Sequence, residues 1–381
     1  MHEIVITNAV RTPIGQFGGV FKSTSAIDLL SACLASESCL ELVDHVYAGC
    51  VLSAGLGQNP ARQAALQAAV PASVSATTIN KVCGSGMQAV FDARNALLAR
   101  NGHVIIAAGM ENMSMAPHLL AGARCVGMKY GTRPLLDHLE HDGLLDAYTR
   151  RSMGGIADEI AKAHNLSREA QEEYALYSCQ RAVHARDAGV FSNEIVPVNV
   201  RESQICEDEC IIAVNPEKMR ALKPAFSADG TITAATASKI ADGASCVTMM
   251  RVETAAEYGM SAIAKIVGCA VYGGNPENFA YAPVGAIQKL MQQIGWETAD
   301  IFEINEAFAI VPMLVSKQLN ISIEKINVHG GACAIGHPLG NSGCRVVVTL
   351  LNALRQKGMN RGIAALCVGG GEGIAMAVEM L

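Results

Sequence analysis

Cys83 is the first residue of this 381-residue chain whose setting suggests chemistry. It follows a run of small and β-branched residues and precedes Gly-Ser-Gly in ATTINKVCGSGMQAV, a pattern that predicts a buried strand, a sharp turn and a helix. Because a helix N-terminus favours negative charge, we expect the thiol to ionise readily and to act as a nucleophile. The alternative is a cysteine that only packs in the turn.

Three further segments offer partners for this thiol. His337 lies among glycines in VHGGACAIGHPLGNSG, and histidine is the natural base for a cysteine nucleophile. Cys367 ends a buried apolar run before the glycine loop of LCVGGGEG, and Asn305 of FEINEAFA could hold a water molecule or a carbonyl oxygen. Each of the three also has a purely structural interpretation, as a buried histidine, a core cysteine or a helix cap.

A zinc site is the other chemistry that these segments could support. The four candidate ligands are His329, Cys333, His337 and Cys344. Structural zinc sites usually take paired ligands at short spacing, whereas glycines separate these side chains and no C-x-x-C pair is present. We therefore expect no metal at this position.

An α/β fold must position these residues, because short β-like runs alternate with helical ones from EIVITNAV onward. Shifting the chain by 257 places aligns Gly86 with Gly343 and NAL with NAL, and three further places align VIIAAG with AALCVG. In both copies a glycine-rich turn opens a helix and a buried strand follows. We infer two related α/β halves, with chance similarity as the alternative.

The predicted N-terminal half comprises residues 1–112 and about 239–259, and the C-terminal half comprises residues 260–381. Residues 113–238 fit neither copy. They carry more charge, and SREAQEEYALYSCQRAVHARDAG predicts an amphipathic helix. An insertion after a strand is a common place for a domain that covers the substrate.

The composition excludes several classes of function. A net charge of −6 argues against nucleic acid as a partner. No apolar stretch reaches the roughly 18 residues of a membrane span, and the N-terminus opens as a strand with no targeting pattern. Thirteen cysteines that stand singly do not form a disulfide framework, so we expect a reducing, cytoplasmic location.

Four motifs together resemble one enzyme family. NKVCGSG, NEAFA, GGACAIGHPLGNSG and CVGGGEG occur in the order and spacing of the thiolases, which include acetyl-CoA acetyltransferases and 3-ketoacyl-CoA thiolases. GQNPARQAAL, GMENMSMAPH, KPAF and DGAS extend the resemblance over essentially the whole chain. The resemblance implies two duplicated halves in a layered αβαβα core with an inserted loop domain.

The resemblance also implies a role for each motif residue. Cys83 would carry the acyl group, His337 would activate the Cys83 thiol, and Cys367 would act as acid and base on the second substrate. A water held by Asn305 would form one oxyanion hole with His337, and the backbone N–H groups of Cys83 and Gly369 would form the other. The implied reaction is the reversible conversion of acetoacetyl-CoA and CoA into two acetyl-CoA through an acyl-cysteine, with CoA as substrate and no further cofactor.

The same resemblance implies the residues that contact the substrate. Ser238 would touch pantetheine, and the acyl pocket would be lined by Met153, Phe226, Phe279 and Phe308. Three of the departures from the pattern are single residues in its motifs or near them: Ser152 replaces a frequent histidine and predicts a different CoA placement, Glu372 replaces a usually uncharged residue, and Cys333 adds a thiol near His337.

Alternatives to a short-chain thiolase remain at this point. Phe279 in place of methionine also suits a thiolase for longer or 2-methyl-branched 3-ketoacyl-CoA. A ketoacyl synthase shares the doubled fold but would not carry Cys367 as its third group. A non-catalytic protein that binds acyl-CoA is opposed by the intact motif residues. As in other thiolases, we expect a homodimer or a homotetramer.

Overall fold

The centre of the computed structural model, which describes residues 3–126 and 130–381, is one mixed sheet of ten strands. Its order is β12-β13-β14-β11-β1-β10-β5-β3-β4, with β2 paired to β10. The first half of the chain supplies β1 (Ile4–Arg11), β2 (Gly15–Gln16), α1 (Ala26–Ala35), β3 (His45–Gly49), α2 (Pro60–Gln67), β4 (Ser75–Ile79), α3 (Ser85–Leu98), β5 (Val104–Asn112), β10 (Ala241–Arg251) and α8 (Val252–Glu257). The second half supplies β11 (Ala264–Gly273), α9 (Ala282–Ile294), β12 (Ile301–Ile304), α10 (Ile310–Leu319), α11 (Ala332–Ile335), α12 (Leu339–Lys357), β13 (Arg361–Val368) and β14 (Glu372–Met380).

The two halves repeat one succession of strands and helices. In the first half β3 pairs in parallel with β4 and β5, and β10 runs antiparallel to β5. In the second half β12 pairs in parallel with β13, a bridge from Phe302 to Ile326 takes the place of β4, and β14 runs antiparallel to β13. The opening strands β1 and β11 pair with each other and join the halves into one sheet. The predicted duplication is confirmed.

Local sequence explains where the main helices begin and end. Ser25 and Asp28 form a capping box at the start of α1, and Asn59 caps α2 ahead of a proline. Gly295 and Gly358 end α9 and α12 with positive φ values of 71° and 60°. β5 and β10 are buried along their whole lengths, as expected for strands that are covered on both faces.

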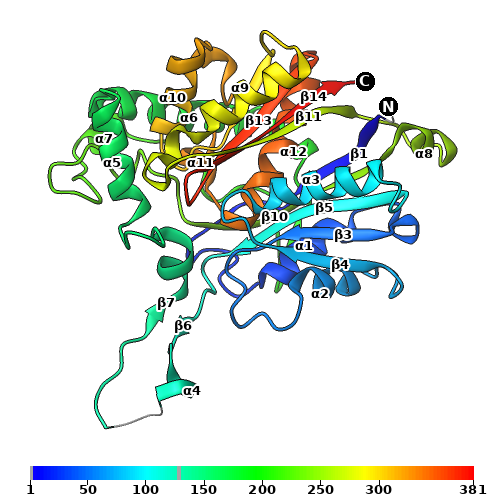
Figure 1. Cartoon of the computed structure of the whole chain (residues 1–381), viewed down its shortest axis with the longest axis horizontal. Helices are drawn as coiled ribbons and strands as arrows, with labels where there is room; N and C mark the ends of the chain where they lie inside the picture. The colour runs from blue at the N-terminus through cyan, green and yellow to red at the C-terminus, as the bar shows by residue number, and fades with distance from the viewer. Residues whose placement is uncertain (1–2, 127–129) are drawn as a thin grey trace.

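Helices α3 and α12 lie between the two halves of the sheet and pack against each other (Figure 1). α1 and α2 cover the outer face of the first half, and α9 and α10 cover that of the second. The aligned glycines lie where the inner helices cross: a Cβ on Gly86 would be 2.6 Å from the Cys344 nitrogen, and one on Gly343 would be 2.3 Å from the Met87 nitrogen. This close approach requires glycine, and the layered αβαβα core is confirmed.

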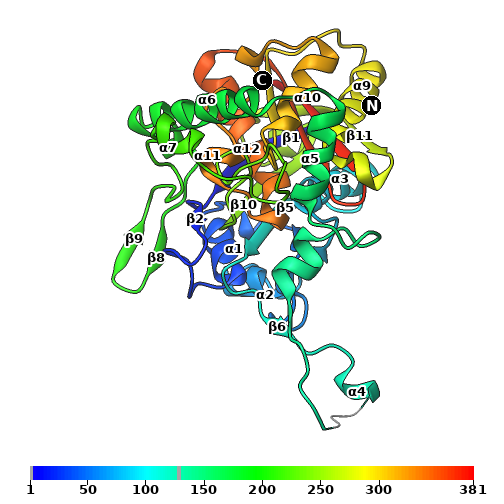
Figure 2. The same cartoon turned by 90° about the vertical axis from the view of Figure 1, so that its left-hand side faces the viewer.

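The segment between β5 and β10 lies at the end of the molecule opposite the two termini (Figure 1). It contains β6 (His118–Leu119), α4 (Ala123–Val126), β7 (Leu136–Asp137), a π-helix (Leu139–Leu144), α5 (Met153–Ala163), α6 (Arg168–Asp187), β8 (Val198–Val200), β9 (Ser203–Ile205) and α7 (Pro216–Arg220). The arm that carries β6, α4 and β7 projects from the body in both views (Figures 1 and 2). The predicted amphipathic helix is α6, which packs on α11. Within the described residues, no helix combines the length and apolarity needed to cross a membrane.

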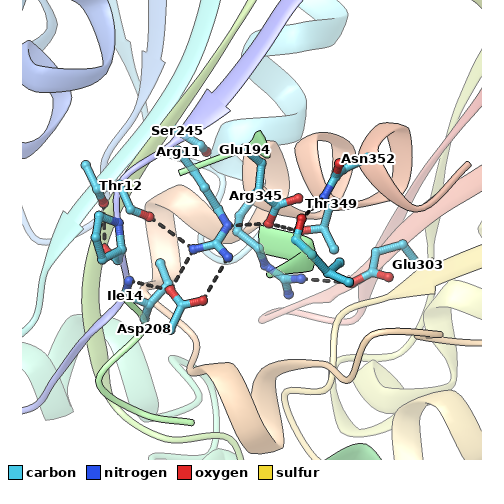
Figure 3. A network of polar contacts seen from close by, with 12 residues as sticks. Arg11, Thr12, Ile14, Glu194, Asp208, Ser245, Glu303, Arg345, Thr349 and Asn352 are labelled. Atoms are coloured by element: carbon cyan, nitrogen blue, oxygen red, sulfur yellow. Dashed lines mark hydrogen bonds and ion pairs between the residues drawn. The ribbon is translucent and has the colours of Figure 1, made fainter. Parts of the chain in front are cut away.

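A buried arginine fixes this inserted segment to the first half (Figure 3). Arg11, at the end of β1, donates from Nε to Glu194 at 2.6 Å and from its two terminal nitrogens to Asp208 at 2.6 and 2.8 Å. Asp208 also accepts the Ile14 backbone N–H, and Glu194 accepts the Thr349 hydroxyl of α12. Because every charged partner is buried, removal of one would leave the others uncompensated.

Candidate active site

Cys83 lies on a tight turn between β4 and α3. The preceding residue, Val82, has a φ of 47°, an unusual conformation for a β-branched side chain. Local hydrogen bonds hold this turn: Asn80 Oδ1 accepts the Val82 N–H at 3.0 Å, and Ser85 Oγ donates to the Val82 carbonyl at 2.7 Å. Ser85 Oγ also accepts the Lys81 N–H at 2.8 Å. The turn therefore holds Cys83 in a strained, well-defined position, as is common at active sites.

The surroundings of Cys83 do not favour its ionisation in the resting enzyme. Burial raises the pKa of the thiol to about 11, hydrogen bonds from the backbone N–H groups of Gly369 and Cys83 oppose the rise, and negative charge on Glu111 adds to it. The expectation of a readily ionised thiol is wrong, because α3 begins two residues later and burial outweighs the N–H groups. These two N–H groups are nevertheless the pair predicted to form an oxyanion hole.

Cys367 is the penultimate residue of β13 and lies beside Cys83. It is buried, and its pKa is raised well above the usual value, first by burial and then by negative charge on Cys83. Gly370 and Gly371, with φ values of 90° and 86°, then turn the chain into β14. The fold therefore brings the two predicted sulfurs together from positions 284 residues apart (367 − 83).

His337 lies between α11 and α12 with its tautomer set by Ser342. The Nδ1 atom is 2.6 Å from the Ser342 Oγ, which donates its proton to the Pro338 carbonyl at 2.8 Å. Because that hydroxyl has one proton, the imidazole must donate from Nδ1, which leaves Nε2 free as an acceptor. Burial and, to a smaller extent, positive charge on Arg345 together lower the pKa of His337 to about 3, so the ring is neutral at pH 7.

Asn305 follows β12 directly and is fully buried. Its side-chain nitrogen lies 3.4 Å from both ring nitrogens of His337. Its side-chain oxygen accepts from Arg345 at 3.2 Å, and Arg345 donates to Glu303 at 2.8 Å, a pair visible in Figure 3. Arg345 therefore orients the amide so that its N–H groups face the imidazole.

A cavity of about 360 Å³ adjoins these groups. Of the predicted site residues, it is lined by His337, Ser238, Met153, Phe226 and Phe308. Cys83, Cys367 and Asn305 are not among its lining residues. Cys83 packs on the apolar cluster that contains Met113 and Leu339, two residues of the cavity wall, so the Cys83 thiol lies next to that wall.

Phe279 does not line this cavity, contrary to the sequence prediction. The side chain is 2% exposed and packs edge to face on Phe308, with ring centroids 6.1 Å apart. Phe279 therefore packs behind Phe308, which forms the cavity wall. The position of Phe279 in the sequence does not show that Phe308 lies between it and the cavity.

The three departures from the family pattern have different surroundings. Ser152 lines the cavity and caps α5, since its Oγ accepts the Gly155 N–H at 3.1 Å. Cys333 is buried beside Glu306 and away from the cavity. Glu372 forms an ion pair with Lys81. In residues 3–126 and 130–381, no three His, Cys, Asp or Glu side chains are grouped so that they could hold a metal ion.

Sequence reasoning missed Glu111, a fully buried carboxylate on β5. It accepts backbone N–H groups from Val51 at 3.1 Å, Leu52 at 3.0 Å and Gly340 at 2.8 Å. It therefore joins two loops that border the cavity, including the start of α12. An acidic residue at the end of the buried run VIIAAGMEN was the signal for such a partner.

Glu306, next to Asn305, was missed in the same way. Its carboxylate accepts from Tyr174 at 2.7 Å, Ser178 at 2.8 Å and Asn327 at 2.8 Å, and from the Cys333 N–H at 2.9 Å. Tyr174 and Ser178 come from α6, so this carboxylate anchors the inserted segment to the loop that carries Asn305. Arg345 was the third omission, signalled by a cation within the apolar run that begins α12.

Comparison with known proteins identifies the family. A family model described as the thiolase N-terminal domain matches residues 4–253, and one described as the thiolase C-terminal domain matches residues 260–380. The chain belongs to the thiolase family. The resemblance drawn from the motifs is thereby confirmed, and with it the prediction of an acyltransferase enzyme.

Relatives of this thiolase match it over its whole length. It is 43% identical over 392 residues to the acetyl-CoA acetyltransferase of Cupriavidus necator, with 100% of both chains covered. The solved thiolase Acat5 of Ascaris suum, a complex with coenzyme A, superposes with a TM-score of 0.94 at 38% identity and covers 100% of both chains. The acetyl-CoA acetyltransferase of Bacillus anthracis gives 0.95 at 37% identity, covering 100% of this chain and 99% of that one.

Proposed function

We propose that this thiolase interconverts acetoacetyl-CoA plus CoA and two acetyl-CoA through an acetyl group carried on Cys83. The observation that carries the proposal is the grouping of two sulfurs under one pair of N–H donors. The Cys83 sulfur accepts from the Gly369 N–H, Cys367 lies beside it, and neutral His337 lines the adjoining cavity. One thiol can hold the acyl group while the other moves the proton on carbon.

In the thiolysis direction, His337 Nε2 accepts the proton of Cys83 and the sulfur adds to the ketone carbon of acetoacetyl-CoA. The N–H groups of Cys83 and Gly369 stabilise the tetrahedral oxyanion. In comparable enzymes each such donor lowers the activation free energy by about 2.7–4 kcal/mol. Collapse breaks the bond between the ketone carbon and the α-carbon. The products are acetyl-Cys83 and the enolate of acetyl-CoA.

Cys367 then donates its proton to the enolate carbon and becomes a thiolate. Its raised pKa keeps this thiol protonated until that step. A water held by Asn305, together with the protonated His337 ring, stabilises the thioester oxygen of the enolate. The thiol of CoA next gives its proton to Cys367 and attacks acetyl-Cys83, and the departing Cys83 sulfur recovers its proton from His337.

The closeness of the two sulfurs also matters in the condensation direction. A thiolate at Cys83 would raise the pKa of Cys367 beyond the effect of burial, so the two sulfurs do not ionise together. An acetylated Cys83 cannot carry that charge, so Cys367 can lose its proton without a neighbouring thiolate when it must act as the base.

Short acyl chains fit the cavity best. Phe226 and Phe308 meet edge to face with centroids 6.0 Å apart, and a Cβ on Gly154 would lie 2.3 Å from the Phe226 ring. These rings close the 360 Å³ space that must also admit the end of the pantetheine arm. The alternatives are 3-ketoacyl-CoA substrates that are longer or branched at the 2-position.

We also propose that residues 113–238 form a domain that covers the substrate, since Ser152, Met153, Phe226 and Ser238 all line the cavity. CoA serves as a substrate, with no further cofactor. A homodimer or homotetramer and a reducing, cytoplasmic location complete the proposal. The location is supported by the twelve cysteines whose side chains the structure describes, all of which are free.

A thiolysis assay tests the activity. Purified enzyme is mixed with acetoacetyl-CoA and CoA, and the absorbance of the acetoacetyl enolate is followed. We expect a loss that requires CoA and yields two acetyl-CoA per turnover. No loss at micromolar enzyme would refute the proposed function, and faster thiolysis of a longer or 2-methyl-branched substrate in a chain-length series would replace the short-chain assignment.

A further inference from the structure

The turn that carries Cys83 and the turn that follows Cys367 are in direct contact. A Cβ on Gly84 would lie 2.9 Å from Val368 Cγ2, and one on Gly369 would lie 3.3 Å from Val82 Cγ1. Glycine on each side permits this approach. The contact consists of apolar groups and of the hydrogen bond from the Gly369 N–H to the Cys83 sulfur. Because apolar contact is not directional, it does not fix the orientation of one turn relative to the other.

An ion pair spans the same two turns. Lys81 stands two residues before Cys83, and Glu372 is the first residue of β14, paired across the hairpin with Val368. The Lys81 Nζ contacts a Glu372 carboxylate oxygen. The side chains of Lys81 and Glu372 are 23% and 39% exposed, so ions in the solvent can reach both. Among the described residues, no other ion pair joins these turns.

The glycine hairpin beside Cys367 is held at Gly371 and open at Gly370. The Gly371 carbonyl accepts the Gly274 N–H at 2.9 Å and a Cβ on Gly371 would lie 2.6 Å from the Asn275 backbone, whereas a Cβ on Gly370 would meet no atom within 4 Å. Neither Lys81 nor Glu372 lines the cavity, so neither is placed to contact substrate. Their position suits restraint of the hairpin and does not suit binding.

We propose that the Lys81–Glu372 ion pair latches the Cys83 turn to the Cys367 turn and sets the relative position of the two sulfurs, which makes Glu372 a positioning residue. The inference rests on the proposed function. It accounts for the charged residue that stands at position 372, where the family pattern has an uncharged one.

The latch affects one half of the reaction more than the other. Transfer of an acetyl group to Cys83 uses the Cys83 thiol, His337 and the Gly369 N–H, and of these groups only the Gly369 N–H lies on the Cys367 turn. Exchange of the α-protons of acetyl-CoA requires the Cys367 sulfur itself to reach the α-carbon of a substrate bound beside Cys83. Since a misplacement of about 1 Å at a reacting group costs up to about 100-fold, partial loosening should slow exchange about tenfold.

The experiment compares Glu372→Gln with Glu379→Gln. Glu379 lies near the other end of β14 and pairs with Lys265 at 2.8 Å, so it is a matched loss of charge away from the turns. We expect Glu372→Gln to acquire the full amount of label from radiolabelled acetyl-CoA at a rate within about twofold of wild type and to slow α-proton exchange about tenfold, with KM within about twofold of wild type. Glu379→Gln should match wild type in all three. The charge-swapped variant Lys81→Glu with Glu372→Lys should recover most of the lost rate.

Salt provides a second readout. Raising ionic strength from about 0.05 to 1 M shortens the screening length from above 10 Å to about 3 Å, so wild-type exchange should approach the rate of Glu372→Gln, and that variant should respond little. Exchange at the wild-type rate in Glu372→Gln, equal slowing in Glu379→Gln, or a swapped variant no faster than the single variants would overturn the latch.

Alkylation tests the latch independently of turnover. Iodoacetamide modification of Cys83 and Cys367, quantified on their separate peptides, should show about a threefold or greater rise at Cys367 in Glu372→Gln over Glu379→Gln, because the loosened hairpin opens more often. An unchanged ratio would refute the latch. An inactive wild-type enzyme with the expected alkylation change would refute the proposed function alone.

Discussion

Replacing Glu111 by glutamine should change how the stability of this thiolase depends on pH. Glu111 is a fully buried carboxyl group whose oxygens accept the N–H groups of Val51, Leu52 and Gly340. Burial raises its pKa from 4.5 to about 7, although these hydrogen bonds oppose the rise. The folded protein therefore binds the Glu111 proton more tightly than the unfolded chain does.

The sign and size of the effect follow from that difference. Below pH 4.5 the group is protonated in both states, and the free energy of unfolding does not depend on its titration. As the pH rises from 4.5 to about 7, the unfolded chain loses this proton first, so the folded state is progressively destabilised. At about 1.36 kcal/mol for each pH unit, the loss approaches about 3 kcal/mol and does not grow further above about pH 7.

Glu111→Gln removes this titration. At pH 4.5 the variant should be about 1–3 kcal/mol less stable than wild type, because its amide N–H group faces a backbone N–H group that needs an acceptor. As the pH rises to 8, wild type should lose about 3 kcal/mol through the Glu111 titration and the variant should not, so the difference should shrink to near zero or change sign. Urea unfolding followed by circular dichroism at a series of pH values measures this difference.

The matched control is Glu37→Gln, another buried carboxyl group with a pKa raised by burial. Its oxygens accept from the side chains of Thr248 and Asn8, away from the cavity. Glu37→Gln should show a pH-dependent difference of the same sign and keep wild-type thiolysis, whereas Glu111→Gln should also slow thiolysis because Gly340 begins the helix next to His337. Parallel stability curves for wild type and Glu111→Gln across this pH range would refute the reasoning.

The remaining predictions concern the reacting groups and their support. Cys83→Ala should acquire no label from radiolabelled acetyl-CoA, and a labelled variant would contradict its role as nucleophile. Cys367→Ala should still acquire label but lose condensation and α-proton exchange; condensation near the wild-type rate would place the base elsewhere. Arg345→Met should lose about 3–5 kcal/mol of stability in urea unfolding, because Glu303 is left buried without its partner, and should slow exchange by releasing Asn305. Wild-type stability and exchange together would refute that assignment.

Much of the fold was predictable because its signals are local. The alternation of β-like and helical runs predicted the α/β fold, glycine-rich turns predicted the starts of α3 and α12, and the amphipathic pattern of residues 167–189 predicted α6. The repeat of Gly86 at Gly343 was also visible in the sequence. The reason for the repeat was not visible in the sequence. Gly86 of α3 contacts α12, and Gly343 of α12 contacts α3, where the two helices cross. Only packing between distant segments explains why both positions need glycine.

The candidate site divides in the same way. The identities of Cys83, His337, Cys367 and Asn305 came from motifs, and the fold brings all four to one cavity wall or its immediate support. Their protonation did not follow from the motifs. Burial raises the pKa of Cys83, where the sequence predicted a readily ionised thiol. Phe279 is buried behind the cavity wall that the sequence predicted it would line.

By itself, the sequence determined the thiolase family, the alternation of strands and helices, and which side chains are chemically able to carry and deprotonate an acyl group. The tertiary structure decided the state of those side chains: which nitrogen of His337 is free, which thiol holds its proton, and which buried charges are paired. The physical reason is that pKa and orientation depend on desolvation and on partners supplied by segments far apart in the chain, such as Arg345 for Asn305 and Glu372 for Lys81.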